Sequence, residues 1–195
     1  MIPLALLVMT MPVSAPAQPV DDLGRWHAGA YSYSHELGGF AIVGISGEGT
    51  ESDPVVLTQE FLSASPVTLV IRAERPIRSP LFGSGFANGN IHIRVVAINN
   101  SNLPWLEFEF ELQEHLGEPS TFGDGLSFDQ RKTASSYIAS DTYAEYSRDY
   151  EPYDRLRFFN GYTDARKTST FDFLITDFTP RSVFYLVQDP RIPSS

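Results

Sequence analysis

Apolar and polar residues alternate without interruption near the middle of the chain. The apolar positions are Leu106, Phe108, Phe110 and Leu112, and the polar positions are Glu107, Glu109, Glu111 and Gln113. A period of two is that of a β-strand with one buried face and one face in water. This segment therefore predicts an antiparallel sheet that is packed on one side.

Similar short runs recur along the chain, separated by clusters of Gly, Pro and Asn. The predicted strands are 40–46, 55–61, 67–73, 91–99, 106–113, 126–129, 157–159, 169–176 and 183–188, with one more short strand at 31–34. Fourteen Gly and fourteen Pro favour many short strands over long helices. We expect one antiparallel, jelly-roll-like β-sandwich of about eight to nine strands over 40–190, with a barrel as the alternative.

The regions outside 40–190 are expected to play smaller parts. Residues 18–39 form a leading segment that holds the short strand, and 191–195 form a tail. Residues 130–155 break the strand pattern. Thr142 and Glu145 have the spacing of a capping box, and Pro152 could end a helix, so a short helix is predicted near 142–151.

The N-terminus has the features of a secretory signal. Ile2 to Met9 is an apolar run too short to span a bilayer, and Ala15-Pro16-Ala17 is a small-x-small cleavage pattern. No Lys or Arg precedes the run, which departs from the usual signal; the alternative is a buried N-terminal strand. We expect residues 1–17 to be a signal peptide and the mature protein to be periplasmic or extracellular, without an integral membrane span.

Composition excludes several functions. The formal net charge is −10 and the scattered basic residues disfavour nucleic-acid and anionic-membrane binding. The chain has no Cys, which removes thiol catalysis and thiolate metal sites. Its four His form no zinc-binding pattern, and no catalytic motif is present, so the sequence favours a non-enzymatic protein without a cofactor.

Several segments occur in a familiar order. They are the Asn99-Asn100-Ser101-Asn102 turn, Trp105, Phe108 to Leu112, Gly123 to Phe128, Asp154 to Gly161, Phe171 to Ile175 and Phe184 to Pro190. This order resembles the functionally uncharacterised exported β-sandwich modules of bacterial surface proteins, including those sorted by PEP-CTERM tails. The resemblance covers about residues 40–190 and implies no catalytic residues. Only five residues follow Pro190, where members sorted in that way carry an apolar anchor.

Three glutamates on one strand face form the first candidate site. Glu107, Glu109 and Glu111 are spaced about 6.8 Å apart, which could suit the carboxylate pair of an inverting glycosidase. Catalytic pairs need one carboxyl group in apolar surroundings. We therefore expect this row to be the solvated face of the sheet.

A glycine-rich loop forms the second candidate. Asp124 and Asp129 flank a turn with further oxygen-bearing residues nearby, so a calcium ion is one interpretation. The spacing does not match an EF-hand. The favoured interpretation is a tight turn in which Asp124 bonds to its own backbone.

The tyrosines between 137 and 162 form the third candidate. On the predicted helix Tyr143, Tyr146 and Tyr150 would share a face, and Tyr153 follows. Exposed aromatic rings stack on sugars or anchor a protein partner, whereas buried ones would form a lid over the sandwich. We expect an interaction module that binds a protein or glycan at the cell surface. The alternatives are a carbohydrate-binding or glycoside-acting module and a structural subunit of a surface layer or filament.

Export gives the first testable prediction. Mass spectrometry of the native protein should find an N-terminus at or near Gln18. A soluble cytoplasmic protein that retains Met1 would contradict the signal-peptide interpretation.

Overall fold

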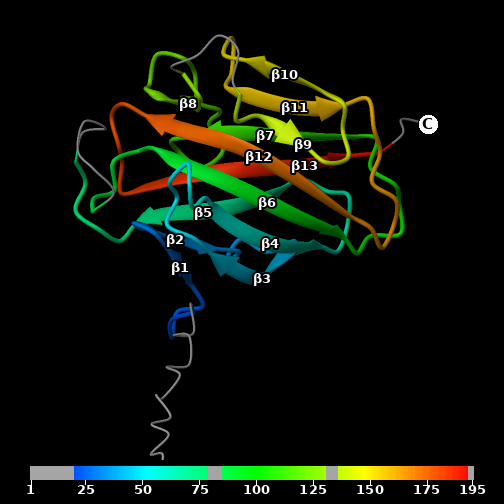
Figure 1. Cartoon of the computed structure of the whole chain (residues 1–195), viewed down its shortest axis with the longest axis horizontal. Coiled ribbons are helices and arrows are strands. Elements are labelled where there is room, and N and C mark those ends of the chain that lie inside the picture. The colour runs from blue at the N-terminus through cyan, green and yellow to red at the C-terminus, as the bar shows by residue number, and fades with distance from the viewer. Residues whose placement is uncertain (1–19, 79–84, 131–135, 193–195) are drawn as a thin grey trace, which may run out of the picture.

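The computed structural model describes residues 20–78, 85–130 and 136–192. The predicted signal peptide lies outside these ranges. Within them the chain forms thirteen strands and no helix (Figure 1). The strands are β1 (Trp26–Ala28), β2 (Tyr31–Ser34), β3 (Phe40–Ser46), β4 (Val55–Phe61), β5 (Val67–Ala73), β6 (Ile91–Asn99), β7 (Glu107–Gln113), β8 (Leu126–Phe128), β9 (Ala139–Ser140), β10 (Glu145–Asp149), β11 (Arg155–Phe159), β12 (Thr168–Asp177) and β13 (Val183–Arg191).

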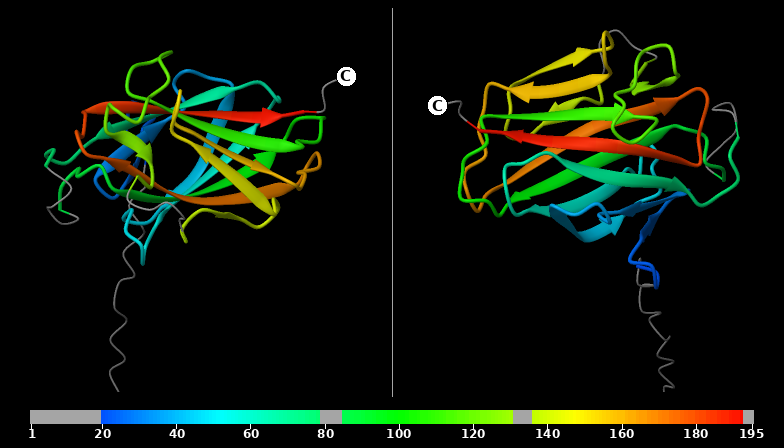
Figure 2. Two further views of the ribbon diagram at one scale, coloured as in Figure 1. Left: turned by 90° about the horizontal axis from the view of Figure 1, so that it is seen from above. Right: turned by 180° about the vertical axis from the view of Figure 1, so that it is seen from behind.

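The strands form two sheets packed face to face, as the views in Figure 2 show. The seven-stranded sheet has the order β1-β2-β5-β13-β7-β11-β10. The six-stranded sheet has the order β3-β4-β6-β12-β8, with β9 also paired to β12. The pairings are antiparallel apart from that of β4 with β6, which is parallel. The predicted β-sandwich is therefore confirmed.

Aromatic rings fill the space between the sheets. Phe108 of β7 lies 4.7 Å from Phe171 of β12, measured between ring centroids, and so joins the centres of the two sheets. Phe61 and Trp105 meet Phe108 edge to face. Such edge-to-face and tilted pairs are favourable arrangements of the ring quadrupoles and add to the hydrophobic gain of burial. All four side chains are 1% exposed or less.

One polar pair crosses this apolar core. Gln59 of β4 and Gln188 of β13 are both 0% exposed, and each side-chain amide donates to the other's oxygen, at 3.2 and 2.8 Å. A buried amide without a partner costs free energy, so each glutamine needs the other in place. The pair fixes how β4 lies against β13.

Four sequence predictions need correction. The sandwich has thirteen strands rather than eight or nine, because β1, β9 and β10 are short strands without a clear alternating pattern. The helix near 142–151 is wrong: Glu145–Asp149 is β10, held by pairing with β11. Leu106 precedes β7 and is 42% exposed, because the adjacent Trp105 fills the core at this point. Pairing was expected to be antiparallel throughout, but β4 and β6 are parallel.

The leading segment also takes part in the sandwich. Its residues form β1 and β2, and β2 pairs with β5 along Tyr31–Ser34. Tyr33 is 0% exposed, so this segment adds to the core as well as to the sheet.

Phe108 gives the second prediction. Phe108→Ala should lower the free energy of unfolding by about 3–5 kcal/mol, because it removes a ring that contacts both sheets. Chemical denaturation measures this loss. Leu106→Ala, at an exposed neighbouring site, should change the value by only about 0.5 kcal/mol. Equal losses in the two variants would contradict the packing described here.

Candidate functional site

Two adjoining hollows open on the six-stranded sheet and at its end. The first, the face hollow, has a volume of about 240 Å³ and is lined by Glu51, Pro54, His92, Ile93, Arg94, Ser136, Tyr137, Ala139, Asp172 and Phe173. The second, the end hollow, has a volume of about 200 Å³ and is lined by Ala28, Ala30, Tyr31, Glu48, Gly49, Thr50, Glu51, Val55, Phe86, Asn88, Asn90, Ile91 and His92. Glu51 and His92 line both hollows, and we call the two together the groove.

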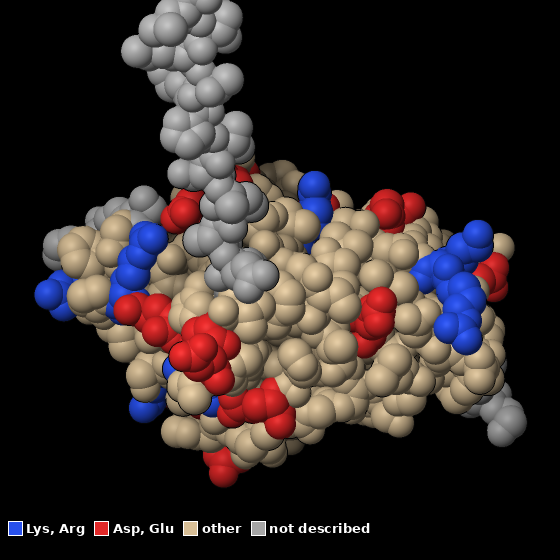
Figure 3. All heavy atoms as spheres, turned by 90° about the horizontal axis from the view of Figure 1, so that it is seen from below, with Lys and Arg blue, Asp and Glu red and all other residues tan. Residues whose placement is uncertain are grey.

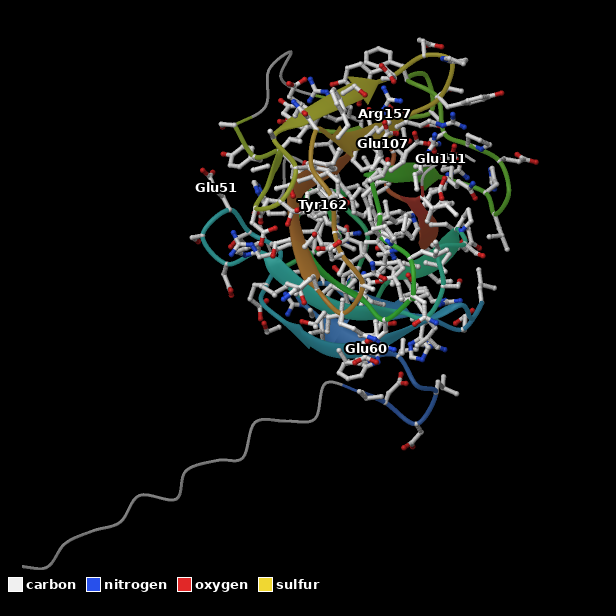
Figure 4. All side chains as sticks on the ribbon, turned by 90° about the vertical axis from the view of Figure 1, so that its right-hand side faces the viewer. Glu51, Glu60, Glu107, Glu111, Arg157 and Tyr162 are labelled. Carbon is white, nitrogen blue, oxygen red and sulfur yellow. The ribbon has the colours of Figure 1, made fainter. Side chains whose placement is uncertain are left out.

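The loop between β3 and β4 forms one wall of the groove. Thr50 and Asp53 bond to each other through their backbones, and the Glu48 N–H also donates to the Asp53 carbonyl. Gly47 has φ +92°, and a Cβ there would lie 1.9 Å from the Pro54 carbonyl oxygen. Only glycine fits such a position. This tight loop places Glu51 at its tip, on the opposite side of the sandwich from Glu107 and Glu111 (Figure 4).

The segment around β9 forms the facing wall. Ile138 is 6% exposed and Tyr143 is 4% exposed, so the core holds the segment at both ends. The Tyr143 ring stacks on Phe171, and its hydroxyl donates to the Trp105 carbonyl at 3.2 Å. Immediately before the Ile138 anchor, Tyr137 faces the groove, with its ring edge to face against His92 at a centroid distance of 4.8 Å.

β6 and β12 form the floor. Along β6 Ile91, Ile93 and Val95 are buried in the core, so the alternate residues His92 and Arg94 face outward. The Arg94 guanidinium donates to both Asp172 oxygens, at 2.6 and 3.2 Å. This bidentate pair is the strong form of an ion pair, and it raises the pKa of Arg94 further above its usual value.

Glu51 and Tyr137 join the two walls across the floor. The Glu51 carboxylate is hydrogen-bonded to the Tyr137 hydroxyl, and this bond raises the pKa of the phenol. Because Glu51 and His92 line both hollows, this contact marks their boundary. The groove therefore has two compartments that meet at one carboxylate.

The end hollow is closed at its back by a buried tyrosine. The Tyr31 hydroxyl accepts the Gly89 N–H at 2.8 Å, and burial raises its pKa to about 12. Asn88 and Asn90 line the same hollow. Besides Glu48 and Glu51, a ligand would meet neutral hydrogen-bonding groups here, since the Tyr31 phenol keeps its proton near neutral pH.

The predicted tyrosine face is divided between different surroundings. Tyr143 lies in the core, and Tyr146 packs against Phe158 at a centroid distance of 6.3 Å. The Tyr150 hydroxyl donates to the Phe128 and Asp129 carbonyls, at 3.4 Å each. Of the four predicted ligand-binding tyrosines, Tyr153 is the most exposed, at 39%. The four do not form one surface.

The glutamate row lies on the outer face of the seven-stranded sheet, but it is not the freely solvated face that we expected. Arg191 pairs with Glu109 at 2.8 Å, and Arg155 pairs with Glu111 at 2.7 Å. The side chains of Glu109 and Glu111 are only 12% and 13% exposed. The arginines come from the neighbouring strands β11 and β13, which the sequence pattern does not place beside β7.

The two aspartates of the calcium hypothesis have different roles. Asp124 accepts the backbone N–H groups of Thr121 and Leu126, at 3.0 and 3.1 Å, as in a tight turn. Asp129 is 1% exposed, and neither of its carboxylate oxygens has a hydrogen-bond partner in the structure as described. Among the described residues no group of three or more acidic, His or Cys side chains could hold a metal ion.

The groove contains several residues that sequence reasoning missed. His92, Arg94 and Asp172 read as polar positions of ordinary strands, and Glu51 as part of a loop. Tyr137 belongs to the tyrosine-rich segment, but nothing in the sequence distinguishes it from its neighbours. A weak signal is present in Arg94 and Asp172, since opposite charges on outward positions suit cross-strand pairing.

The surface charge is mixed. Figure 3 shows one face, seen from below, on which Lys and Arg lie in separate groups between acidic side chains. Phosphate binding needs clustered basic residues. The described part of this face has no such cluster.

Comparisons with known proteins add no family: neither the family models, nor the curated proteins, nor the solved structures contain a match. Within the described ranges no helix is long and apolar enough to cross a membrane.

A buried carboxyl group gives the third prediction. Asp154 is 0% exposed and accepts the Ser127 hydroxyl at 2.7 Å, and burial raises its pKa from 3.8 to about 7. From about pH 4 to about pH 7 the folded state keeps the proton that the unfolded state releases, so stability falls as pH rises. Asp154→Asn should remove this loss, so its free energy of unfolding should exceed that of the wild type by about 2 kcal/mol at pH 8.

Thermal melts of both proteins between about pH 4 and pH 8 measure this difference. The variant and the wild type should be nearly equal at the acidic end. Asp22→Asn, at an exposed position, is the control and should follow the wild type. A wild type that gains stability between these pH values, relative to Asp154→Asn, would contradict the assignment.

Proposed function

We propose that this protein is an exported, non-enzymatic glycan-binding module and that the groove is its binding site. The observation that carries the proposal is the position of the Tyr137 ring. A half-buried aromatic ring is held over a hollow whose floor and ends present planar polar side chains. Sugars offer a flat apolar face together with hydroxyl groups, and a ring beside Arg, Asp and Asn matches both.

The shape of the groove supports this proposal. Drug-sized ligands occupy pockets of roughly 300–1,000 Å³, and each hollow is smaller, at about 240 and 200 Å³. Two adjoining compartments suit two neighbouring units of a chain better than one bulky molecule. The rigid walls reduce the ordering that binding would require.

The chemistry of the lining favours binding over catalysis. General acid–base catalysis works best with a pKa near the working pH. Tyr31, Tyr137 and Arg94 of the lining each have a pKa raised away from neutrality, so these three groups do not suit that role. The buried Asp154, with its pKa of about 7, is absent from the lining of both hollows.

The edges of the sheets favour a binding module over a filament subunit. Shared strands need an open, regular edge. β3 has a bulge between Ile42 and Gly44, and β10 carries Glu145, Arg148 and Asp149. Bulges and charges are two means by which proteins prevent edge-to-edge pairing.

Glycan binding gives the fourth prediction. The purified protein should bind a subset of the glycans on an array of bacterial and plant glycans. Tyr137→Ala should weaken the binding of that subset about fivefold to thirtyfold, since ring stacking and desolvation together contribute about 1–2 kcal/mol. Circular dichroism and melting temperature should stay close to wild type, because Tyr137 is not in the core.

Tyr153→Ala is the matched control, because it removes an exposed ring on the β10–β11 turn, outside the groove. This variant should bind glycans as the wild type does. Loss of binding in Tyr153→Ala with retention in Tyr137→Ala would move the site from the groove to that turn. If the protein binds no glycan on the array, the proposed function is refuted.

A further inference from the structure

The charges of the groove are unevenly compensated. Arg94 and Asp172 neutralise each other through their bidentate pair, and Glu48 lies 3.6 Å from Arg75. Glu51 has no ion pair among the described residues, and its hydrogen-bond partner Tyr137 is a neutral phenol. With His92 counted as neutral, the described lining residues therefore carry a net negative charge that is concentrated at Glu51.

Glu51 also has a special position. It lines both hollows, so a ligand that occupies the two compartments passes beside its carboxylate. The loop that carries it is anchored to the sheet, since the His92 N–H donates to the Gly49 carbonyl at 3.0 Å. A fixed carboxylate at the middle of a groove favours a cationic group on the ligand and disfavours an anionic one.

We propose that the groove prefers glycans that carry a free, protonated amino group, such as partly deacetylated amino-sugar chains, and that Glu51 determines this preference. The inference rests on the proposed glycan-binding function and specifies its ligand class. It also excludes uronic-acid and sulfated chains as preferred ligands. A carboxylate of such a chain would face Glu51 in a protein whose formal net charge is already −10.

Two ligands that differ only in N-acetylation, and so in the charge on the amino group, provide the test. Glucosamine tetramer and N-acetylglucosamine tetramer are titrated by calorimetry at mildly acidic pH, where the amine of glucosamine is protonated. The wild type should bind the glucosamine tetramer about threefold to fivefold more tightly, as expected for a partly exposed ion pair. The preference should shrink at high salt, because screening weakens exposed charge pairs.

Glu51→Gln isolates the charge, since its amide oxygen can still accept the Tyr137 hydroxyl proton. This variant should bind both tetramers with nearly the same affinity, and its affinity for the acetylated tetramer should match the wild type. Glu118→Gln is the matched control: it removes the same charge at an exposed position outside the groove lining and should keep the preference.

The outcomes separate this inference from the proposed function. Equal binding of the two tetramers by the wild type, or a preference that persists in Glu51→Gln, would overturn the role of Glu51 while glycan binding stands. Preferred binding of a uronic-acid chain would likewise overturn the amino-sugar preference alone. Failure to bind either tetramer or any glycan of the array would refute both.

Discussion

The contact between Phe108 and Phe171 is the interaction on which the rest of the structure depends. These rings belong to central strands of opposite sheets and lie 4.7 Å apart between centroids. Phe61, Trp105, Phe110 and Tyr143 pack around the two rings. A sandwich has no backbone hydrogen bonds between its layers, so side-chain packing of this kind must hold the sheets together.

Polar contacts at the core and at the margin decide how the packed sheets are aligned. The Gln59–Gln188 pair would be broken by a shift of one sheet along the other, which would leave two buried amides unpaired. At the margin Arg148 of β10 donates to the Phe128 and Asp129 carbonyls, at 3.3 and 3.1 Å. This contact closes the side of the sandwich where β8 and β10 form the edges of the two sheets.

The groove depends on the same core. Tyr143 and Ile138 hold the segment that carries Tyr137, and Tyr143 is itself stacked on Phe171. The facing loop is held by its internal hydrogen bonds and by Gly47. The Tyr137 ring and the Glu51 carboxylate are thus placed by residues that no ligand would touch. The sandwich supplies the support, and the outward residues of β6 and β12 form the floor of the groove.

The sequence by itself determined the class of fold and most of the strands. Eight expected segments, such as 91–99 and 106–113, match observed strands at both ends or within one residue, because alternation of apolar and polar residues reports directly which face is buried. The strands β1 and β9 were missed because two or three residues are too few to show a period. The strand β10 was missed because its mixed charges and the nearby capping-box spacing are also typical of a helix.

Only the tertiary structure decided which side chains meet. It covered the glutamates of β7 with arginines from β11 and β13, and it buried Tyr143 while it left Tyr137 at the groove. It also brought Glu51, His92, Tyr137 and Asp172 together from four separate parts of the chain. Alternation states which face of a strand is buried but not which strand lies beside it, because that depends on packing between residues far apart in sequence.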